Sequence, residues 1–112
     1  MTKMPKPLEL ILEGEEDIQS LLHECKRPVA VSLTNFLLWA LEYNIDSFIF
    51  AEVIVQHPDG FQDVMKMGCK RPDYLEACRK QLAHLIEFEE YELCPKLQEW
   101  IDYLEVEEKV KK

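Results

Sequence analysis

The stretch that decides the fold is SFIFAEVIVQHPDGFQDVMKM, residues 47–67. Its first half is rich in β-branched and aromatic residues, which favour strands. The turn residues HPDG follow at 57–60. Proline presets the first turn position, aspartate suits the second, and glycine accepts the left-handed conformation. The stretch therefore predicts a β-hairpin.

The turn also predicts how the two strands pair. If His57 pairs with Phe61, the remaining partners follow by counting outward. Apolar residues then face apolar residues and an acid faces a base: Val53 with Met65, Ile54 with Val64, and Glu52 with Lys66. Such cross-strand pairs stabilise a sheet, so turn chemistry and side-chain chemistry favour the same register.

The segment before the hairpin predicts the central helix. Residues 36–41 read FLLWAL and are apolar on nearly every side, and a helix without a polar face is one that other elements surround. Ser32 or Thr34 is expected to cap its start. Asn44 is expected to end it in the left-handed conformation.

The N-terminal region predicts a strand followed by a helix. Residues 8–13 nearly alternate between apolar and polar, as a half-buried strand does. Gly14 ends that strand, and the acidic residues 15–17 favour a helix start. Pro28 is expected to close the helix. The apolar face of this helix consists of Ile18, Leu21, Leu22 and Cys25.

Two further helices are predicted after the hairpin. The first starts at Pro72 and Asp73, because proline suits the first helical position. Its apolar stripe is Leu75, Cys78, Leu82, Leu85 and Ile86, and Glu76 and Lys80 form a favourable i,i+4 pair. Residues 88–90 predict a break. The last helix runs from about Tyr91 to Glu107, with Leu93, Leu97, Trp100, Ile101 and Leu104 on its inner side.

These elements predict one α+β domain over residues 1–112, with frayed ends at 1–7 and 108–112. The strand at 8–13 and the hairpin are expected to form a small antiparallel sheet. This sheet would pack on the central apolar helix and on a C-terminal antiparallel helix pair. The chain is 47% apolar, which is typical of a globular protein and too high for a disordered one.

The overall composition excludes several classes of function. With 22 acidic and 13 basic side chains the formal charge is −9, which disfavours direct binding to nucleic acid. No apolar segment of signal-peptide length follows the first lysines. Residues 29–55 are the most apolar, but Glu42, Asp46 and Glu52 interrupt them, so no membrane span is expected. We expect a cytoplasmic protein with reduced cysteines.

The cysteines do not predict a catalytic or metal site. His23, Cys25, Cys69 and Cys78 lack the paired CxxC spacing of structural zinc ligands, so no metal or cofactor is expected. Cys69 is the best candidate nucleophile, because the adjacent residues 70–71 are basic and positive charge lowers a thiol pKa. A base and an orienting group are missing from the sequence pattern, so no enzyme activity is expected.

The acidic residues are concentrated in two segments. Residues 9–24 contain six acids and no base, and residues 87–108 contain nine acids and one base, Lys96. Residues 25–86 hold seven of each. If the two segments lie side by side, they form an acidic face that attracts a basic partner. The alternative is that these carboxylates only keep the helices solvated.

The leading hypothesis is a non-catalytic binding module of the inhibitor, immunity or antitoxin type. Its acidic surface would occupy a basic surface of a partner protein, without a cofactor. The predicted partner-binding residues are Glu87, Glu89, Glu90, Glu92, Glu99 and Asp102.

Residues 82–101, LAHLIEFEEYELCPKLQEWI, suggest a second hypothesis. The pattern contains an aromatic–Glu pair at 91–92, a small residue at 94, and aliphatic residues at 97 and 101. It resembles the UVR motif, a helical hairpin of nucleotide-excision-repair subunits and of adaptors in bacterial protease systems. The chain departs from the motif at Pro95 and at Gln98-Glu99, where the motif has alanine and Arg-Asp. The resemblance implies an adaptor that docks on a repair or proteolysis complex through Tyr91, Leu97, Trp100 and Ile101.

Overall fold

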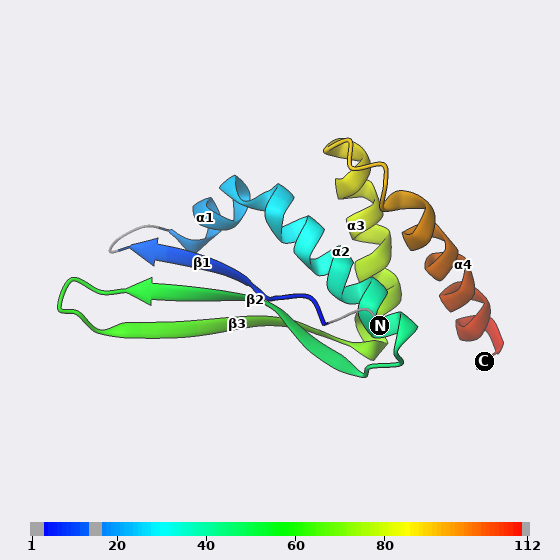
Figure 1. Ribbon diagram of the computed structural model, residues 1–112, viewed down its shortest axis with the longest axis horizontal. Helices are drawn as coiled ribbons and strands as arrows, with labels where there is room; N and C mark the ends of the chain where they lie inside the picture. The colour runs from blue at the N-terminus through cyan, green and yellow to red at the C-terminus, as the bar shows by residue number, and fades with distance from the viewer. Residues whose placement is uncertain (1–3, 14–16, 111–112) are drawn as a thin grey trace.

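The structure, a computed structural model, describes residues 4–13 and 17–110. In these residues a three-stranded mixed sheet packs against four α-helices, which confirms the α+β class (Figure 1). The elements in chain order are β1 (Leu8–Glu13), α1 (Ile18–Glu24), α2 (Lys26–Glu42), β2 (Ser47–Gln56), β3 (Gln62–Lys70), the 3₁₀ helix η1 (Arg71–Asp73), α3 (Tyr74–Glu87) and α4 (Cys94–Val110).

The hairpin of β2 and β3 has the predicted register. The backbone N–H of His57 donates to the carbonyl of Phe61 at 2.9 Å, and Gly60 closes the turn with a φ of 88°. All three predicted cross-strand pairs are confirmed: Glu52 with Lys66, Val53 with Met65, and Ile54 with Val64.

The direction of β1 differs from the prediction. β1 pairs with β2 in parallel, with Leu8 opposite Ala51 and Glu13 opposite Gln56, so the sheet is mixed and not antiparallel. The reason is the connection: α1 and α2 form a helical crossover, which returns the chain to the end of the sheet from which β1 started. Alternation of apolar and polar residues carries no information about strand direction.

The boundary between the first two helices also differs from the prediction. Asp17 caps α1 by accepting from the backbone N–H of Gln19 at 3.2 Å, whereas the predicted break and acidic start at 14–16 lie outside the described residues. Pro28 does not end a helix but lies in the first turn of α2. N–H groups there have no acceptor within the helix, so a proline costs no hydrogen bond.

Ser32 and Thr34 therefore lie inside α2 and do not cap it. The Thr34 hydroxyl donates to the carbonyl of Ala30 at 2.8 Å. The Ser32 hydroxyl donates at 2.9 Å to the carbonyl of Phe50, the β2 residue at which the register with β3 shifts. Ser32 thus ties α2 to the sheet at an irregular point of the β2–β3 ladder, where a backbone carbonyl needs a partner.

Both α2 and α3 end in a left-handed residue. Asn44 has a φ of 56° after α2, as predicted, and the N–H of Ile45 donates to the carbonyl of Ala40 at 2.8 Å. Glu89 has a φ of 60° after α3, where the sequence predicted only a break. This pattern of bonds and dihedral angles is the Schellman motif.

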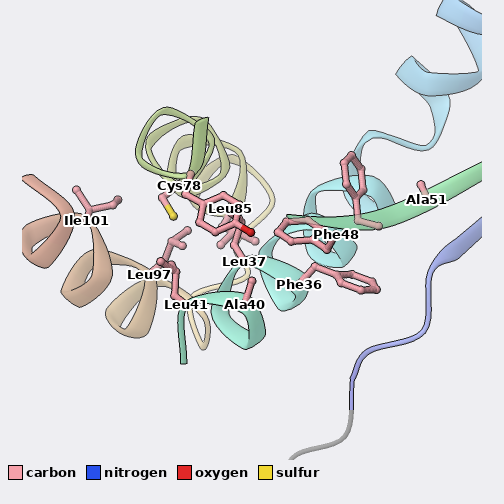
Figure 2. Packing of buried hydrophobic residues seen from close by; sticks show 12 residues of the cluster. Phe36, Leu37, Ala40, Leu41, Phe48, Ala51, Cys78, Leu85, Leu97 and Ile101 are labelled. Carbon is pink, nitrogen blue, oxygen red and sulfur yellow. The ribbon is translucent and has the colours of Figure 1, made fainter. Parts of the chain in front are cut away.

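The main core lies where α2, α3, α4 and the near half of β2 meet (Figure 2). Its centre is a stack of three aromatic rings: Phe48 lies between Phe36, at 5.4 Å, and Tyr74, at 5.6 Å. The Tyr74 hydroxyl donates to the carbonyl of Ile45 at 2.8 Å. The stack joins α2, β2 and α3, so α2 is the central helix that its apolar residues predict.

The predicted inner sides of the last two helices are largely correct. Leu97 and Ile101 of α4 are buried, and so are Cys78 and Leu85 of α3. All four belong to the main core cluster. Ile86 is the exception, since it is 53% exposed. The buried positions of α3 follow one narrow side, and Ile86 lies a third of a turn away from it. Of the predicted frayed ends, residues 1–3 and 111–112 lie outside the described ranges. Residues 108–110 are helical and not frayed, since the last helix spans Cys94–Val110 instead of about 91–107. Lys109 in its last turn suits the negative end of the helix dipole.

Candidate functional site

The two acidic segments do not form one face. β1 and α1 lie at one end of the molecule and α4 lies at the other, with α2 and α3 between them (Figure 1). The candidate site is therefore the C-terminal acidic segment alone. It comprises the loop between α3 and α4 and the exposed side of α4.

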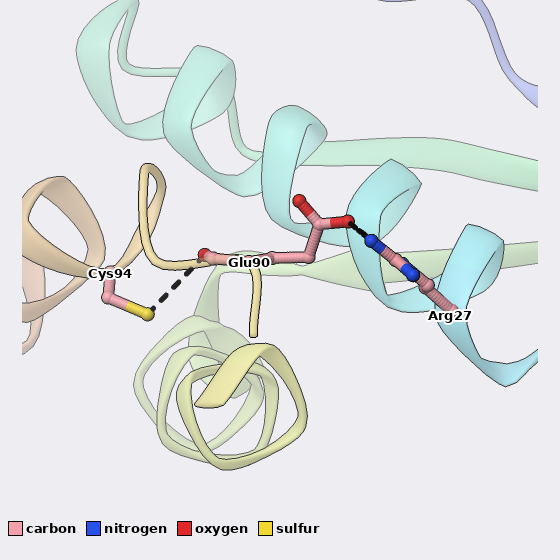
Figure 3. Close-up of polar contacts among 3 residues, drawn as sticks. All are labelled: Arg27, Glu90 and Cys94. Atoms are coloured by element: carbon pink, nitrogen blue, oxygen red, sulfur yellow. Dashed lines mark hydrogen bonds and ion pairs between the residues drawn. The ribbon is translucent and has the colours of Figure 1, made fainter. Parts of the chain in front are cut away.

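Two of the six predicted partner-binding carboxylates are engaged within the protein. Glu87 lies 3.5 Å from the Nζ of Lys26, and Glu90 accepts from Nε of Arg27 at 2.8 Å (Figure 3). Lys26 and Arg27 occupy the first turn of α2, where positive charge is unfavourable to the helix dipole. Glu87, the last residue of α3, and Glu90, in the following loop, offset that charge and hold the end of α3 and the loop against α2, so they are positioning residues of the site.

The loop between α3 and α4 has a defined conformation. The backbone N–H of Glu90 donates to the carbonyl of Leu85 at 2.8 Å, and that of Glu89 donates to Ile86 at 3.1 Å. The Cys94 thiol donates to the carbonyl of Glu90 at 3.6 Å (Figure 3). These bonds hold Glu89 in the left-handed region with its side chain exposed, at a position that usually carries glycine.

Replacing Glu89 by glycine is expected to raise the free energy of unfolding by about 1 kcal/mol, because glycine avoids the left-handed strain of a residue with a Cβ. Urea unfolding followed by circular dichroism measures the change. Glu92→Gly is the matched control in the same loop. Among the described non-glycine residues, those with a positive φ are Asn44 and Glu89. Glu92 is not one of them, so Glu92→Gly should not raise the free energy of unfolding. A stabilising control would contradict this account.

The other four predicted carboxylates are exposed: Glu89, Glu92, Glu99 and Asp102, which we call the α4 acidic surface. Among the described residues none of the four takes part in an ion pair, although Asp102 accepts a hydrogen bond from Gln98 at 2.9 Å. Their charges are therefore not neutralised by neighbouring bases. The arrangement provides negative potential at one end of the molecule.

A cleft of about 670 Å³ opens beside this surface, between α4 and the end of α2. Trp100 and Tyr103 line it with rings 5.5 Å apart in an edge-to-face arrangement, and Glu99 lies at the same cleft. Arg71 lines it as well, but its Nε donates to Asp46 at 3.1 Å. The sequence prediction missed Tyr103. The feature that could have identified it is its spacing: Tyr103 follows Trp100 by three residues, which brings the two rings to neighbouring turns of the last helix.

The four residues of the predicted adaptor interface divide into two groups. Leu97 is 0% and Ile101 3% exposed, so both belong to the core and offer no surface to a partner. Tyr91 is 59% exposed, and Trp100 is partly exposed at the cleft. Leu97 and Ile101 match the aliphatic positions of the motif because those positions suit any amphipathic helix.

Cys69 is not activated in the way its basic neighbours suggested. Burial raises the pKa of the Cys69 thiol and the carboxylate of Asp73 raises it further, while a backbone hydrogen bond with Lys70 offsets part of the shift. Burial likewise raises the pKa of Cys78, to about 12. Both thiols are therefore protonated at neutral pH, which corrects the expectation of a lowered pKa at Cys69.

Iodoacetamide at pH 7 should alkylate Cys69 more slowly in the folded protein than in the urea-unfolded chain. The raised pKa reduces the thiolate fraction, and the thiolate is the reacting form. Peptide mass spectrometry over a time course gives both rates for each cysteine. A faster reaction in the folded protein would show an activated thiol and overturn this assignment.

Three findings complete the description of the site. The described residues contain no group of three or more histidine, cysteine, aspartate or glutamate side chains placed to hold a metal ion. Within the same residues, every helix is too short or too polar to cross a membrane. Comparison with models of protein families gives no match, and no curated protein or solved structure matches the chain.

Proposed function

We propose that this protein is a non-catalytic binding module of the inhibitor, immunity or antitoxin type, whose α4 acidic surface covers a basic surface of a partner protein. The observation that carries the proposal is the set of four exposed carboxylates that form no ion pair within the described residues, one of which, Glu99, lines an aromatic cleft. Complementary charge accelerates and orients such an association.

The cleft suggests how a partner would be anchored. A lysine or arginine side chain entering it would meet the rings of Trp100 and Tyr103 and the carboxylate of Glu99. Cations bind favourably over aromatic faces, and tryptophan and tyrosine are frequent anchors of protein interfaces. The cleft therefore supports a partner that is basic.

Glu89 adds independent support. A residue with a Cβ in the left-handed region costs about 1–2 kcal/mol, and glycine would avoid this cost. Strained residues are found most often at functional sites. In this proposal the carboxylate of Glu89 belongs to the surface that contacts the partner, and that contact offsets the strain.

The remaining parts of the proposal concern compartment and chemistry. All four cysteines are free thiols, which suits the reducing cytoplasm. The excess of acidic groups favours a protein partner over nucleic acid. The raised thiol pKa of Cys69 supports a role without nucleophilic catalysis.

A defined cationic probe tests the proposal. We would titrate a lysine- and arginine-rich peptide into ¹⁵N-labelled protein and map the amide shifts at low and at high salt. Shifts should cluster on residues 89–106 and weaken with salt, because salt screens exposed charges. Shifts centred on β1 and α1, or spread evenly over the protein, would contradict the proposal.

Two variants of equal charge sharpen this test. One replaces three carboxylates of the α4 acidic surface, Glu92, Glu99 and Asp102, by lysine. The other replaces three exposed acids at the opposite end, Glu9, Glu13 and Glu24, by lysine and leaves the α1 cap Asp17 in place. Both sets change the net charge equally, so only the first should abolish binding of the peptide. Equal losses would mean that net charge alone attracts the probe.

The adaptor hypothesis predicts a different salt dependence. With Leu97 and Ile101 in the core, its remaining contacts are Tyr91, which is 59% exposed, and Trp100. An interface built on these rings would be apolar and would resist high salt. A natural partner that binds at high salt and is lost on Tyr91→Ala would favour the adaptor over the acidic module.

A further inference from the structure

The free edge of β3 is the feature of the fold that the acidic surface leaves unexplained. β3 is an edge strand of the sheet, and its residues 62–66 are all exposed. Val64 and Met65, on opposite faces of β3, are 54% and 47% exposed, and Phe61, which directly precedes the strand, is 64% exposed. The hairpin extends beyond the helices, which leaves this edge accessible (Figure 1).

An apolar row crosses the open face of the sheet and ends at this edge. Ile11 of β1 is opposite Ile54 of β2, which is opposite Val64 of β3. The helices cover the other face, so the row of three faces outward. At its β3 end the row stops at Val64, where unpaired backbone groups of an edge strand can accept another strand.

The two edges of the sheet differ in how well they are protected against pairing with another strand. β1 is preceded by Pro5 and Pro7 and carries Glu9 and Glu13, and prolines and charges are the usual means of blocking an edge. β3 contains no proline, and its three charged residues are one acid and two bases: Asp63, Lys66 and Lys70. The strong negative charge of the chain lies elsewhere, so two β3 strands can meet without strong repulsion.

We propose that two copies of this chain associate through β3, antiparallel, with Val64 on the two-fold axis. The result is a continuous six-stranded sheet. Val64 then lies opposite Val64 of the second copy, and the two rows join into one of six apolar residues. The strand that pairs with β3 is the β3 of a second copy, because β3 carries little net charge and exposes an apolar residue, Val64, at the centre of the contact.

The choice of register follows from symmetry and charge. A two-fold axis normal to the sheet pairs residues that share a face, so one residue must oppose its own copy. Centring on Asp63 or Lys66 opposes like charges, and centring on Met65 opposes Val64 with Lys66. Centring on Val64 opposes no like charges and leaves one charged residue facing an apolar one, Asp63 with Met65, while it pairs Gln62 with Lys66 and Phe61 with Met67. Centring on Met65 leaves two such mismatches, because Asp63 then faces Met67 as well.

Analytical ultracentrifugation over a range of concentrations tests the association. The wild-type chain should approach twice its 13.3 kDa mass as concentration rises. Val64→Lys should remain monomeric at the same concentrations, because it opposes two lysines at the axis. Ile11→Lys is the matched control: it changes the same apolar row at the other edge and should still dimerise.

Oxidative cross-linking gives a second measurement that does not depend on a disruptive substitution. Directly opposed residues of antiparallel strands have Cα atoms about 4.5–5.5 Å apart, within disulfide range. Val64→Cys should therefore form a dimer linked through residue 64, as identified by mass spectrometry, beyond the level in oxidised wild type. A wild-type chain that stays monomeric at millimolar concentration would overturn the proposal. Loss of the dimer only in Ile11→Lys, or preferential linkage in Met65→Cys, would also overturn it.

Discussion

Leu97→Ala should lower the free energy of unfolding by about 3 kcal/mol. Leu97 is fully buried in the core cluster that α4 shares with α2 and α3. Removing its side chain loses the transfer free energy of the methyl groups and leaves a cavity. α4 depends on this contact, because Leu97 and Ile101 are its buried residues within the described chain.

Urea unfolding followed by circular dichroism provides the measurement. Val106→Ala, on the same helix at a residue 62% exposed, is the control and should change stability by no more than about 0.5 kcal/mol. The result also bears on function. If Leu97→Ala preserved stability and weakened binding of a partner, Leu97 would be a surface contact, as the adaptor hypothesis requires.

Phe48→Ala should be more damaging still, with an expected loss of about 4 kcal/mol. Phe48 is the middle ring of the aromatic stack, with Phe36 at 5.4 Å on one side and Tyr74 at 5.6 Å on the other. Its removal separates the three elements that the stack joins. Stacked aromatic pairs add about 0.5–1.5 kcal/mol beyond the buried area.

Thermal and urea unfolding of Phe48→Ala should therefore show a lower midpoint with a broad loss of near-ultraviolet signal. Tyr103→Ala is the aromatic control, because Tyr103 is 59% exposed and its ring packs edge-to-face on Trp100 outside the core. It should cost less than about 1 kcal/mol. Equal losses in the two variants would show that the stack is not the centre of the core.

The hairpin was predictable because its information is local. The turn at 57–60 restricts the pairing, and cross-strand chemistry selects the same register. The direction of β1 was not predictable in this way, because it depends on how α1 and α2 cross the sheet. Pro28 misled for a related reason: proline fits both the end of one helix and the first turn of the next.

The candidate site was predictable in composition but not in geometry. The sequence identifies the carboxylates of the last helix. Only the fold shows that Glu87 and Glu90 engage α2, while Glu99 forms no ion pair with any described residue. Cys69 is a second residue whose surroundings could not be predicted from its neighbours in the sequence. Its neighbours in the chain are basic, whereas the charge that acts on its pKa is that of Asp73, brought close by the turn from β3 into η1.

The parallel pairing of β1 has a consequence for the order of folding. β2 and β3 are joined by a tight turn, but β1 pairs with residues more than forty positions away. Closing such a loop costs chain entropy before any contact rewards it, so non-local strands join late. We expect the hairpin to be formed in the transition state and β1 to dock after it. Substitutions in β1 would then accelerate unfolding and leave the folding rate nearly unchanged.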